Sequence, residues 1–185
     1  MDPIRVHIIV GSIREGRLSK PIADWTMDVL AAREDLAPEL IDLKDVDLPM
    51  LSVSKPPAAA YVADYQHAWA ATVGRADAYL IVTPEYNHGI SPVLKNALDH
   101  VYGEWARKPV AFVAHGGMGG ARAVEQLQSV AIALGMAPMA NALHLQGAGK
   151  KRDGERFLGD EADSRRLKGV VDELVWWATA LRSAR

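Results

Sequence analysis

The chain has 185 residues, of which 49% are hydrophobic and 24% charged, and its formal net charge is -2. This balance is ordinary for a globular domain, and the near-neutral charge argues against a nucleic-acid partner. Because cysteine is absent, disulfides, thiolate metal sites and cysteine nucleophiles are excluded. No signal-peptide pattern opens the chain, and no apolar run reaches about 18 residues. We therefore expect a cytoplasmic protein without a membrane partner.

The first part of the chain alternates between strand and helix patterns. Residues 4–10 are rich in β-branched side chains and predict a first strand. Residues 21–30 have helical apolar spacing, and residues 39–43 alternate as a half-exposed strand does. The prolines within 48–57 predict an irregular loop, and 61–75 predict a second helix.

The alternation continues through the second part of the chain. The continuous apolar runs 78–82 and 110–114 are typical of strands buried on both faces of a parallel sheet. Helices are predicted at 91–98 and 124–134, and a last strand at 141–146.

The chain ends with a polar segment and a periodic helix. Residues 147–160 contain several glycines and predict a surface loop. Apolar residues between 167 and 181 recur at helical spacing, which predicts a closing helix with one buried face. In this helix we expect the Trp176-Trp177 pair to serve packing.

The order of elements predicts a single domain over residues 1–185. Alternating strands and helices indicate a three-layer, doubly wound α/β fold with a parallel five-stranded sheet. Two strand orders compete, 3-2-1-4-5 and 2-1-3-4-5. The second and fifth strands alternate and suit sheet edges, whereas the other three suit the interior. This favours the flavodoxin-like order 2-1-3-4-5.

The loop after the first strand has the composition of an anion site. Gly11 allows a tight turn, Ser12 and Ser19 offer hydroxyls, and Arg14 and Arg17 offer guanidinium groups. The loop leads into a helix N-terminus, where free N–H groups favour an anion such as phosphate. It matches neither the Walker A nor the Gly-x-Gly pattern. An ordinary polar turn is the alternative for this loop alone.

Two further loops follow the third and fourth strands. Pro84, Glu85, Tyr86 and Asn87 form the first, and the second contains His115, Gly116, Gly117 and further glycines at 119 and 120. Each alone could be a plain turn. Because parallel strands place their carboxyl ends at one edge, we expect the three loops to meet there. The first loop suits a phosphate, and the other two suit a flat ring between them. FMN has both parts and is known to bind at this point of the 2-1-3-4-5 order.

The chain resembles the NAD(P)H-dependent FMN reductases of flavodoxin-like fold, a group that includes bacterial quinone, chromate and azo-dye reductases. The motifs that carry the resemblance are Gly11-Ser12-x-Arg14 with Ser19, Thr83-Pro84-Glu85-Tyr86-Asn87, Leu94-Lys95-Asn96-Ala97-Leu98-Asp99, and Gly116–Gly120 followed by Arg122. The resemblance extends from residue 4 to about residue 145. Lys20 departs from the family, in which asparagine is common at that position.

The resemblance implies a role for each matching position. Ser12, Arg14 and Ser19, with Arg17 nearby, would bind the FMN phosphate. The loop of Pro84, Glu85, Tyr86 and Asn87 would border the isoalloxazine, mostly through backbone groups. His115, Gly116 and Gly117 would contact the pyrimidine side of the ring, and Gly11 would bind the cofactor from the first loop. The family has no strict acid–base residue, so no catalytic side chain is expected. No metal is expected either, because no histidine in the sequence pairs with another histidine or a carboxylate at metal-ligand spacing.

The expected activity is hydride transfer from NADPH or NADH through FMN to a small-molecule acceptor such as a quinone, flavin or azo compound, with ping-pong kinetics. The family also implies a homodimer or homotetramer. Residues 90–105 place apolar and aromatic groups beside the second loop and are the candidate interface, with ordinary core as the alternative. Two alternatives are an FMN-binding electron carrier of the flavodoxin type and an FMN-binding sensor without turnover. Such carriers are usually strongly acidic, and the net charge of -2 argues against that alternative.

Overall fold

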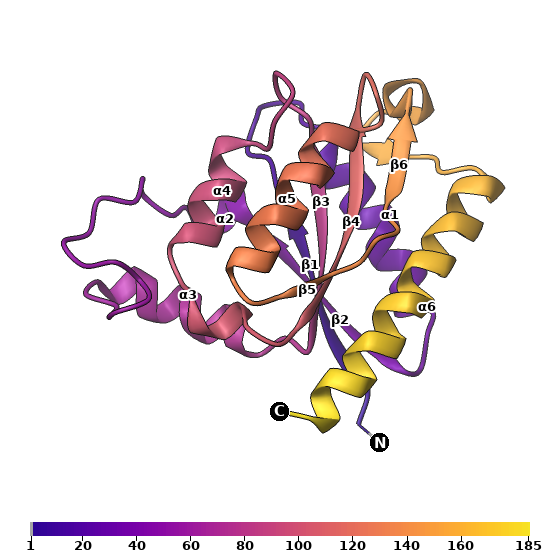
Figure 1. Cartoon of the computed structure of the whole chain (residues 1–185). Helices are drawn as coiled ribbons and strands as arrows, with labels where there is room; N and C mark the ends of the chain where they lie inside the picture. Colours follow the sequence, from indigo (N-terminus) through magenta and orange to yellow (C-terminus); the bar gives the residue numbers. More distant parts are fainter. Residues whose placement is uncertain (1) are drawn as a thin grey trace.

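A parallel sheet covered by helices on both faces forms the centre of the computed structural model, which describes residues 2–185 (Figure 1). The sheet order is β2-β1-β3-β4-β5, with β6 also paired to β4. The strands are β1 (Ile4–Val10), β2 (Leu36–Asp42), β3 (Ala78–Pro84), β4 (Pro109–Gly116), β5 (Ala137–Pro138) and β6 (Leu143–Gln146). The predicted fold class and the predicted strand order are both confirmed.

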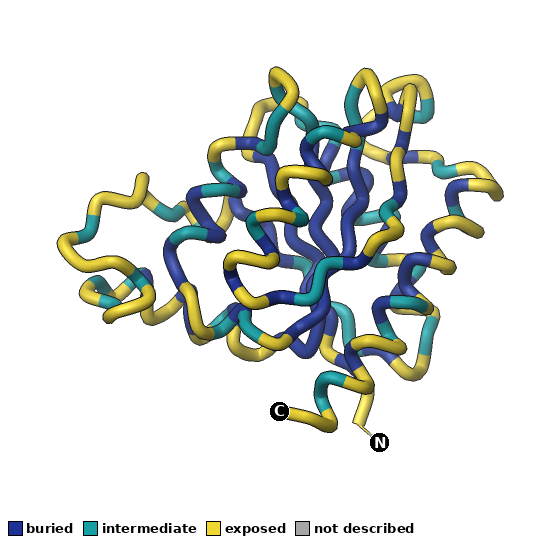
Figure 2. The backbone as a smooth tube through the Cα atoms, in the orientation of Figure 1, coloured by how far each residue is buried: buried dark blue, intermediate teal, exposed yellow. Residues whose placement is uncertain are grey.

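Helices of two groups cover the two faces of the sheet. The helices are α1 (Ser19–Ala31), α2 (Leu43–Val46), α3 (Asp64–Gly74), α4 (Pro92–Asp99), α5 (Ala121–Ala133) and α6 (Glu161–Ser183), with a short 3-10 turn η1 (Gly103–Trp105). One core cluster joins the sheet to α1 and α6, and a second joins it to α3, α4 and α5. The interior strands β1, β3 and β4 are buried almost throughout, while most loops are exposed (Figure 2).

The fifth position of the sheet differs from the predicted single strand at 141–146. Two short segments share it: β5 pairs with the start of β4 and β6 with its end. Pro138 has no N–H to continue the ladder as a donor, and the chain leaves the sheet edge before returning at Leu143. Periodicity alone does not reveal this interruption, because β5 has only two residues.

The segment 147–160 also contains more structure than the predicted surface loop. It forms a 3-10 turn, η2 (Ala148–Lys151), and a small antiparallel pair, β7 (Arg152–Asp153) and β8 (Arg156–Phe157). Phe157 is buried and its ring packs edge-on against Trp25 of α1, with the centroids 5.3 Å apart. One buried aromatic therefore anchors this polar segment on the core.

The expectation that the paired tryptophans serve packing is wrong. Trp176 is 64% exposed and Trp177 is 37% exposed. The buried face of α6 instead consists of residues such as Leu167, Val171 and Leu174. Adjacent helix residues point in different directions, so helical spacing buries one stripe and leaves the tryptophans outside it.

Among residues 2–185, no helix combines the length and apolar character needed to cross a bilayer.

Candidate cofactor site

The three loops meet at the carboxyl end of the sheet, as the sequence predicts. The register pairs Val10 of β1 with Val82 of β3, and Pro84 of β3 with His115 of β4. All three strands therefore end side by side, and their loops lie along the upper edge of the molecule in Figure 1. Gly11 tightens this edge: a Cβ there would lie 3.0 Å from the Val82 carbonyl oxygen.

Hydrogen bonds tie the three loops to one another. The Ser12 hydroxyl lies 2.7 Å from the Tyr86 hydroxyl, which joins the first loop to the second. The Ser19 hydroxyl lies 2.8 Å from Nε2 of His115, which joins the first to the third. The backbone N–H of Glu85 donates to the His115 carbonyl at 3.0 Å, which joins the second to the third. The site is thus built as one connected unit.

The first loop has the features of a phosphate site. Leu18 occupies the N-cap of α1, no side chain caps that helix among residues 2–185, and its first turn contains no acidic residue. A cavity of about 210 Å³ opens beside it. Its lining includes Ser12, Arg14, Glu15, Ser19, Tyr86 and His115. Uncapped helix N–H groups beside hydroxyls and an arginine suit a phosphate, so the residues present fit FMN.

The two arginines of the first loop have different surroundings. Arg17 donates to both carboxylate oxygens of Asp42 at 2.7 and 2.6 Å, and to the Ser12 carbonyl at 2.5 Å. Its guanidinium is therefore already paired, and it holds the first loop against the end of β2. Arg14 forms no ion pair within the described chain, and its guanidinium carbon lies 5.5 Å from the Tyr86 ring centroid. Arg14 is therefore the arginine that remains available to an anion.

The second loop is a tight hairpin. Asn87 and His88 both have positive φ, 48° and 68°, and the amides of Tyr86 and Gly89 donate to each other's carbonyls at 2.9 Å. Two consecutive left-handed residues are the mark of a type I′ turn, which asparagine tolerates well. Gln126 of α5 donates to the His88 carbonyl at 3.0 Å and steadies the tip. A second cavity of about 560 Å³ lies here, lined in part by Arg14, Glu85, Tyr86 and Asn87.

The third loop depends on glycine at two positions. A Cβ on Gly116 would lie 3.1 Å from the Glu85 Cβ, and one on Gly120 would lie 2.6 Å from the Ala114 Cβ. Both glycines have positive φ. A Cβ on Gly117, in contrast, would meet nothing within 4 Å, so this backbone is open to a ligand.

Glu85 and Arg122 form an ion pair between the second loop and the start of α5. The Glu85 carboxylate accepts from the Arg122 backbone N–H at 3.1 Å and from its guanidinium at 2.8 Å. The sequence motifs include both residues, but their contact across 37 positions is not visible in the sequence. Asp42 and Gln126, which hold Arg17 and the hairpin, carry no sequence signal of such roles.

His115 is neutral near physiological pH. Burial lowers the pKa of its imidazole from 6.5 to about 4. A neutral ring can accept a hydrogen bond from the Ser19 hydroxyl, or donate one to it. An additional positive charge is therefore absent from this part of the site.

The shifted pKa of His115 predicts an acid-sensitive fold. Between pH 6.5 and 4 the unfolded chain takes up a proton at this residue that the native chain does not. The free energy of unfolding should therefore fall as the pH falls through this window, by up to about 3 kcal/mol at about 1.4 kcal/mol per pKa unit. Denaturant titrations of the wild type and H115Q at several pH values measure this. A slope that is unchanged in H115Q would contradict the assignment.

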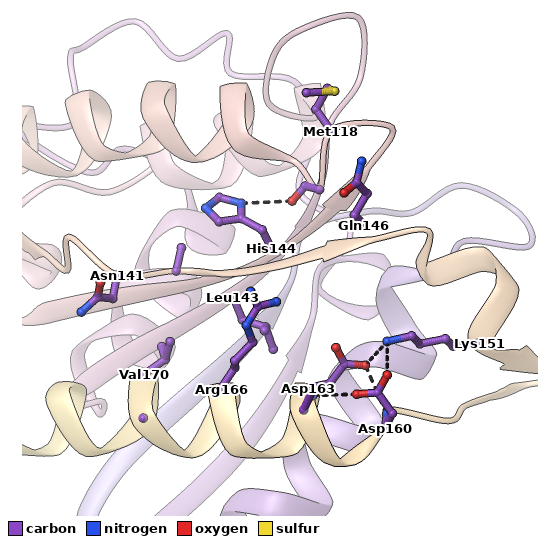
Figure 3. Close-up of a pocket in the computed structure, with 14 residues that line it drawn as sticks. Met118, Asn141, Leu143, His144, Gln146, Lys151, Asp160, Asp163, Arg166 and Val170 are labelled. Carbon is purple, nitrogen blue, oxygen red and sulfur yellow. Dashed lines mark hydrogen bonds and ion pairs between the residues drawn. The ribbon is translucent and has the colours of Figure 1, made fainter.

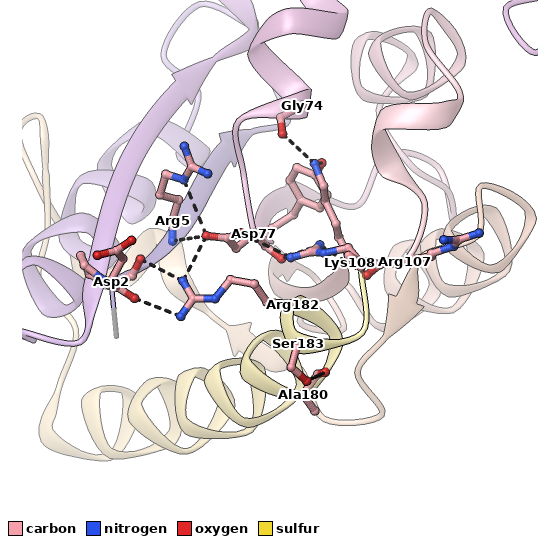
Figure 4. A network of polar contacts seen from close by, with 12 residues as sticks. Asp2, Arg5, Gly74, Asp77, Arg107, Lys108, Ala180, Arg182 and Ser183 are labelled. Carbon is pink, nitrogen blue, oxygen red and sulfur yellow. Dashed lines mark hydrogen bonds and ion pairs between the residues drawn. The ribbon is translucent and has the colours of Figure 1, made fainter.

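Two larger cavities lie away from the first two loops, and only the first of them reaches the third loop, at Met118 and Gly119. One, of about 680 Å³, lies between β6 and α6, where Lys151 pairs with Asp160 and Asp163 of a helix capping box (Figure 3). The other, of about 850 Å³, lies at the amino end of the sheet, where Asp77 pairs with Arg5 and Arg182 (Figure 4). In both places the charged groups mainly fasten α6 to neighbouring segments.

Metal ligation has no candidate cluster in the described part of the chain. Among residues 2–185, no group of three or more histidine, aspartate or glutamate side chains is close enough to hold a metal ion.

Comparisons with known proteins agree with the fold and show the family. Residues 4–150 match the family described as NADPH-dependent FMN reductase. An NAD(P)H-dependent FMN reductase of Schizosaccharomyces pombe is 36% identical over 146 residues, 76% of this chain and 73% of that protein. An NAD(P)H:quinone oxidoreductase of Solanum tuberosum is 28% identical over 176 residues, 91% of this chain and 89% of that protein.

Among solved structures, the flavoenzyme NAD(P)H:(acceptor) oxidoreductase FerB of Paracoccus denitrificans superposes with a TM-score of 0.78 at 25% identity, over 96% of this chain and 98% of that one. The fold and the family match together define a flavodoxin-like oxidoreductase. The chain belongs to the NADPH-dependent FMN reductase family. The expected class of enzyme, and the expected use of FMN with NADPH or NADH, are confirmed at the level of this family.

Proposed function

We propose that this protein passes hydride from NADPH or NADH through bound FMN to a quinone, a flavin, an azo compound or a similar small acceptor. The observation that carries this proposal is the connected set of three loops at the carboxyl end of the sheet. Its hydroxyls, helix N-terminus and open backbone suit a phosphate and a flat ring in neighbouring places.

Different loops bind different parts of FMN. Ser12, Ser19 and the N–H groups at the start of α1 hold the phosphate, and Arg14 supplies the free positive charge. Arg17 acts through the loop, because Asp42 already engages its guanidinium. The remaining residues of the site would hold the ring: Pro84, Glu85, Tyr86 and Asn87 from the second loop, and His115, Gly116 and Gly117 from the third.

FMN, when bound, supplies the hydride chemistry of the reaction. The residues around it orient the ring, and their backbone N–H groups favour the negative charge that reduction adds. The cavity beside Arg14, Tyr86 and Ile90 offers space in which a nicotinamide, and later an acceptor, can lie against the ring. Holding the two reactants together removes much of the entropic cost of transfer.

Because one space serves both substrates, initial-rate kinetics should be ping-pong. NADPH would be varied at several fixed concentrations of a quinone, and the double-reciprocal lines should run parallel. Intersecting lines would contradict the shared site. FMN binding without any NADPH- or NADH-dependent turnover would instead support an electron carrier or a sensor.

The protein should assemble as a homodimer or homotetramer through the surface formed by the 48–63 loop, α4 and α5. Within the candidate interface at 90–105, Leu98, Val101 and Trp105 are core residues. The exposed apolar groups lie beside them: Met50, Tyr102 and Ile132 are 72%, 44% and 66% exposed. Tyr102 lines an apolar groove of about 420 Å³ between the 48–63 loop, the end of α4 and the last turn of α5. Light scattering should detect at least a dimer, and a monomer at micromolar concentration would contradict it.

A further inference from the structure

Helix α5 begins at the third cofactor loop, and the cap of its N-terminus is unusual. Gly120 is its N-cap residue and has no side chain to offer, and its first turn contains no acidic residue. The carboxylate of Glu85, from the loop after β3, occupies this place by accepting from the Arg122 backbone N–H at 3.1 Å. A residue from another loop thus supplies the missing cap and the negative charge that a helix N-terminus favours.

Glu85 is held in this place from several sides. Its side chain is only 7% exposed, and its carboxylate also accepts from the Arg122 guanidinium at 2.8 Å. Its backbone N–H donates to the His115 carbonyl, and its Cβ packs closely against Gly116. Arg122 beside it lowers the pKa of the Glu85 carboxyl, so the residue stays charged. The charge of Glu85 is therefore fixed in position next to the loops that border the ring.

We propose that Glu85 and Arg122 form a charge-balancing pair that sets the reduction potential of the bound flavin, by fixing how much positive charge α5 presents to the ring. This inference rests on the proposed function, because it concerns FMN at the same loops. Glu85 offsets both the guanidinium of Arg122 and the positive end of the helix. Reduction adds negative charge to the flavin, so the net charge of this pair biases the equilibrium between its two redox states.

The proposal predicts opposite shifts for the two partners. E85Q retains an acceptor for the α5 N–H groups but leaves Arg122 uncompensated, so reduced FMN should bind more tightly relative to oxidised FMN and the potential should rise. R122Q leaves Glu85 in place without its cation, so the potential should fall. We expect a change of about three- to tenfold in the ratio of the two dissociation constants in each case. A tenfold change equals about 30 mV for a two-electron couple.

Anaerobic titration of the FMN-loaded protein against reference dyes measures these potentials, and FMN fluorescence measures the affinity of the oxidised form. The double variant E85Q/R122Q should return close to the wild-type potential. The control variants E161Q and R165Q make the same charge changes at a pair on α6 that is 94% and 72% exposed, and should leave the potential unchanged.

If Glu85 and Arg122 only held the loops together, the two variants would not shift the potential in opposite directions. Loosened loops would weaken FMN binding in both variants and move the potential in one direction or not at all, which would overturn the inference. If E85Q does not fold, R122Q and the double variant still test the sign. Failure of the wild-type protein to bind FMN would instead overturn the proposed function.

Discussion

Replacing Gly120 with alanine is expected to lower the free energy of unfolding by about 3 kcal/mol and to abolish FMN binding. Gly120 has a φ of 79°, and a Cβ there would lie 2.6 Å from the Ala114 Cβ and 3.0 Å from the His115 backbone nitrogen. These are atoms of the buried strand β4, which cannot move aside. The start of α5 and the glycine loop would have to shift away from the strand that positions His115.

Denaturant unfolding and an FMN fluorescence titration check this expectation. G149A is the matched control, because a Cβ on Gly149 meets nothing within 4 Å and its φ is not in the left-handed region. It should retain wild-type stability and affinity. A G120A protein with wild-type values would show that the close approach of the loop to β4 is wrong.

The substitution R17Q is expected to cost about 3 kcal/mol of unfolding free energy, while R14Q should cost almost none. Arg17 and Asp42 are 12% and 5% exposed in their side chains, so removal of the cation leaves a buried carboxylate unpaired. Arg14 forms no ion pair within residues 2–185. R14Q should instead weaken FMN binding about tenfold with little change in stability.

The double variant R17Q/D42N tests the cause of the R17Q effect. It removes both charges and retains a side-chain acceptor for the Lys44 N–H that Asp42 caps, so it should recover most of the lost stability. Thermal and denaturant unfolding measure the three proteins side by side. Equal destabilisation by R14Q and R17Q would contradict the different roles of the two arginines.

Much of the fold was predictable because burial leaves a direct trace in the sequence. The uniformly apolar runs at 78–82 and 110–114 require covering on both faces, which places β3 and β4 in the interior of the sheet. The alternation of apolar and polar residues at 39–43 predicts a half-exposed strand, and β2 does lie at an edge of the sheet. The parallel orientation puts the loops after these strands at one end of the sheet, and the strand order makes the loops after β1, β3 and β4 neighbours.

The parts that sequence did not reveal depend on contacts between distant residues. Arg14 and Arg17 have the same chemistry, and only the pairing of β1 with β2 brings Asp42 to Arg17. The Glu85–Arg122 pair depends on β3 lying beside β4. The interruption of the fifth strand and the exposure of Trp176 likewise depend on which surface each residue meets after folding.

The visible spectrum of the purified protein, loaded with FMN and then mixed anaerobically with NADPH, tests directly whether the protein is an FMN-dependent reductase. We expect a bound-flavin spectrum that bleaches within seconds and returns when a quinone is added. A protein that binds no FMN would contradict the cofactor site built from the three loops. Bound FMN that both NADPH and NADH leave oxidised would contradict the proposed reductase activity.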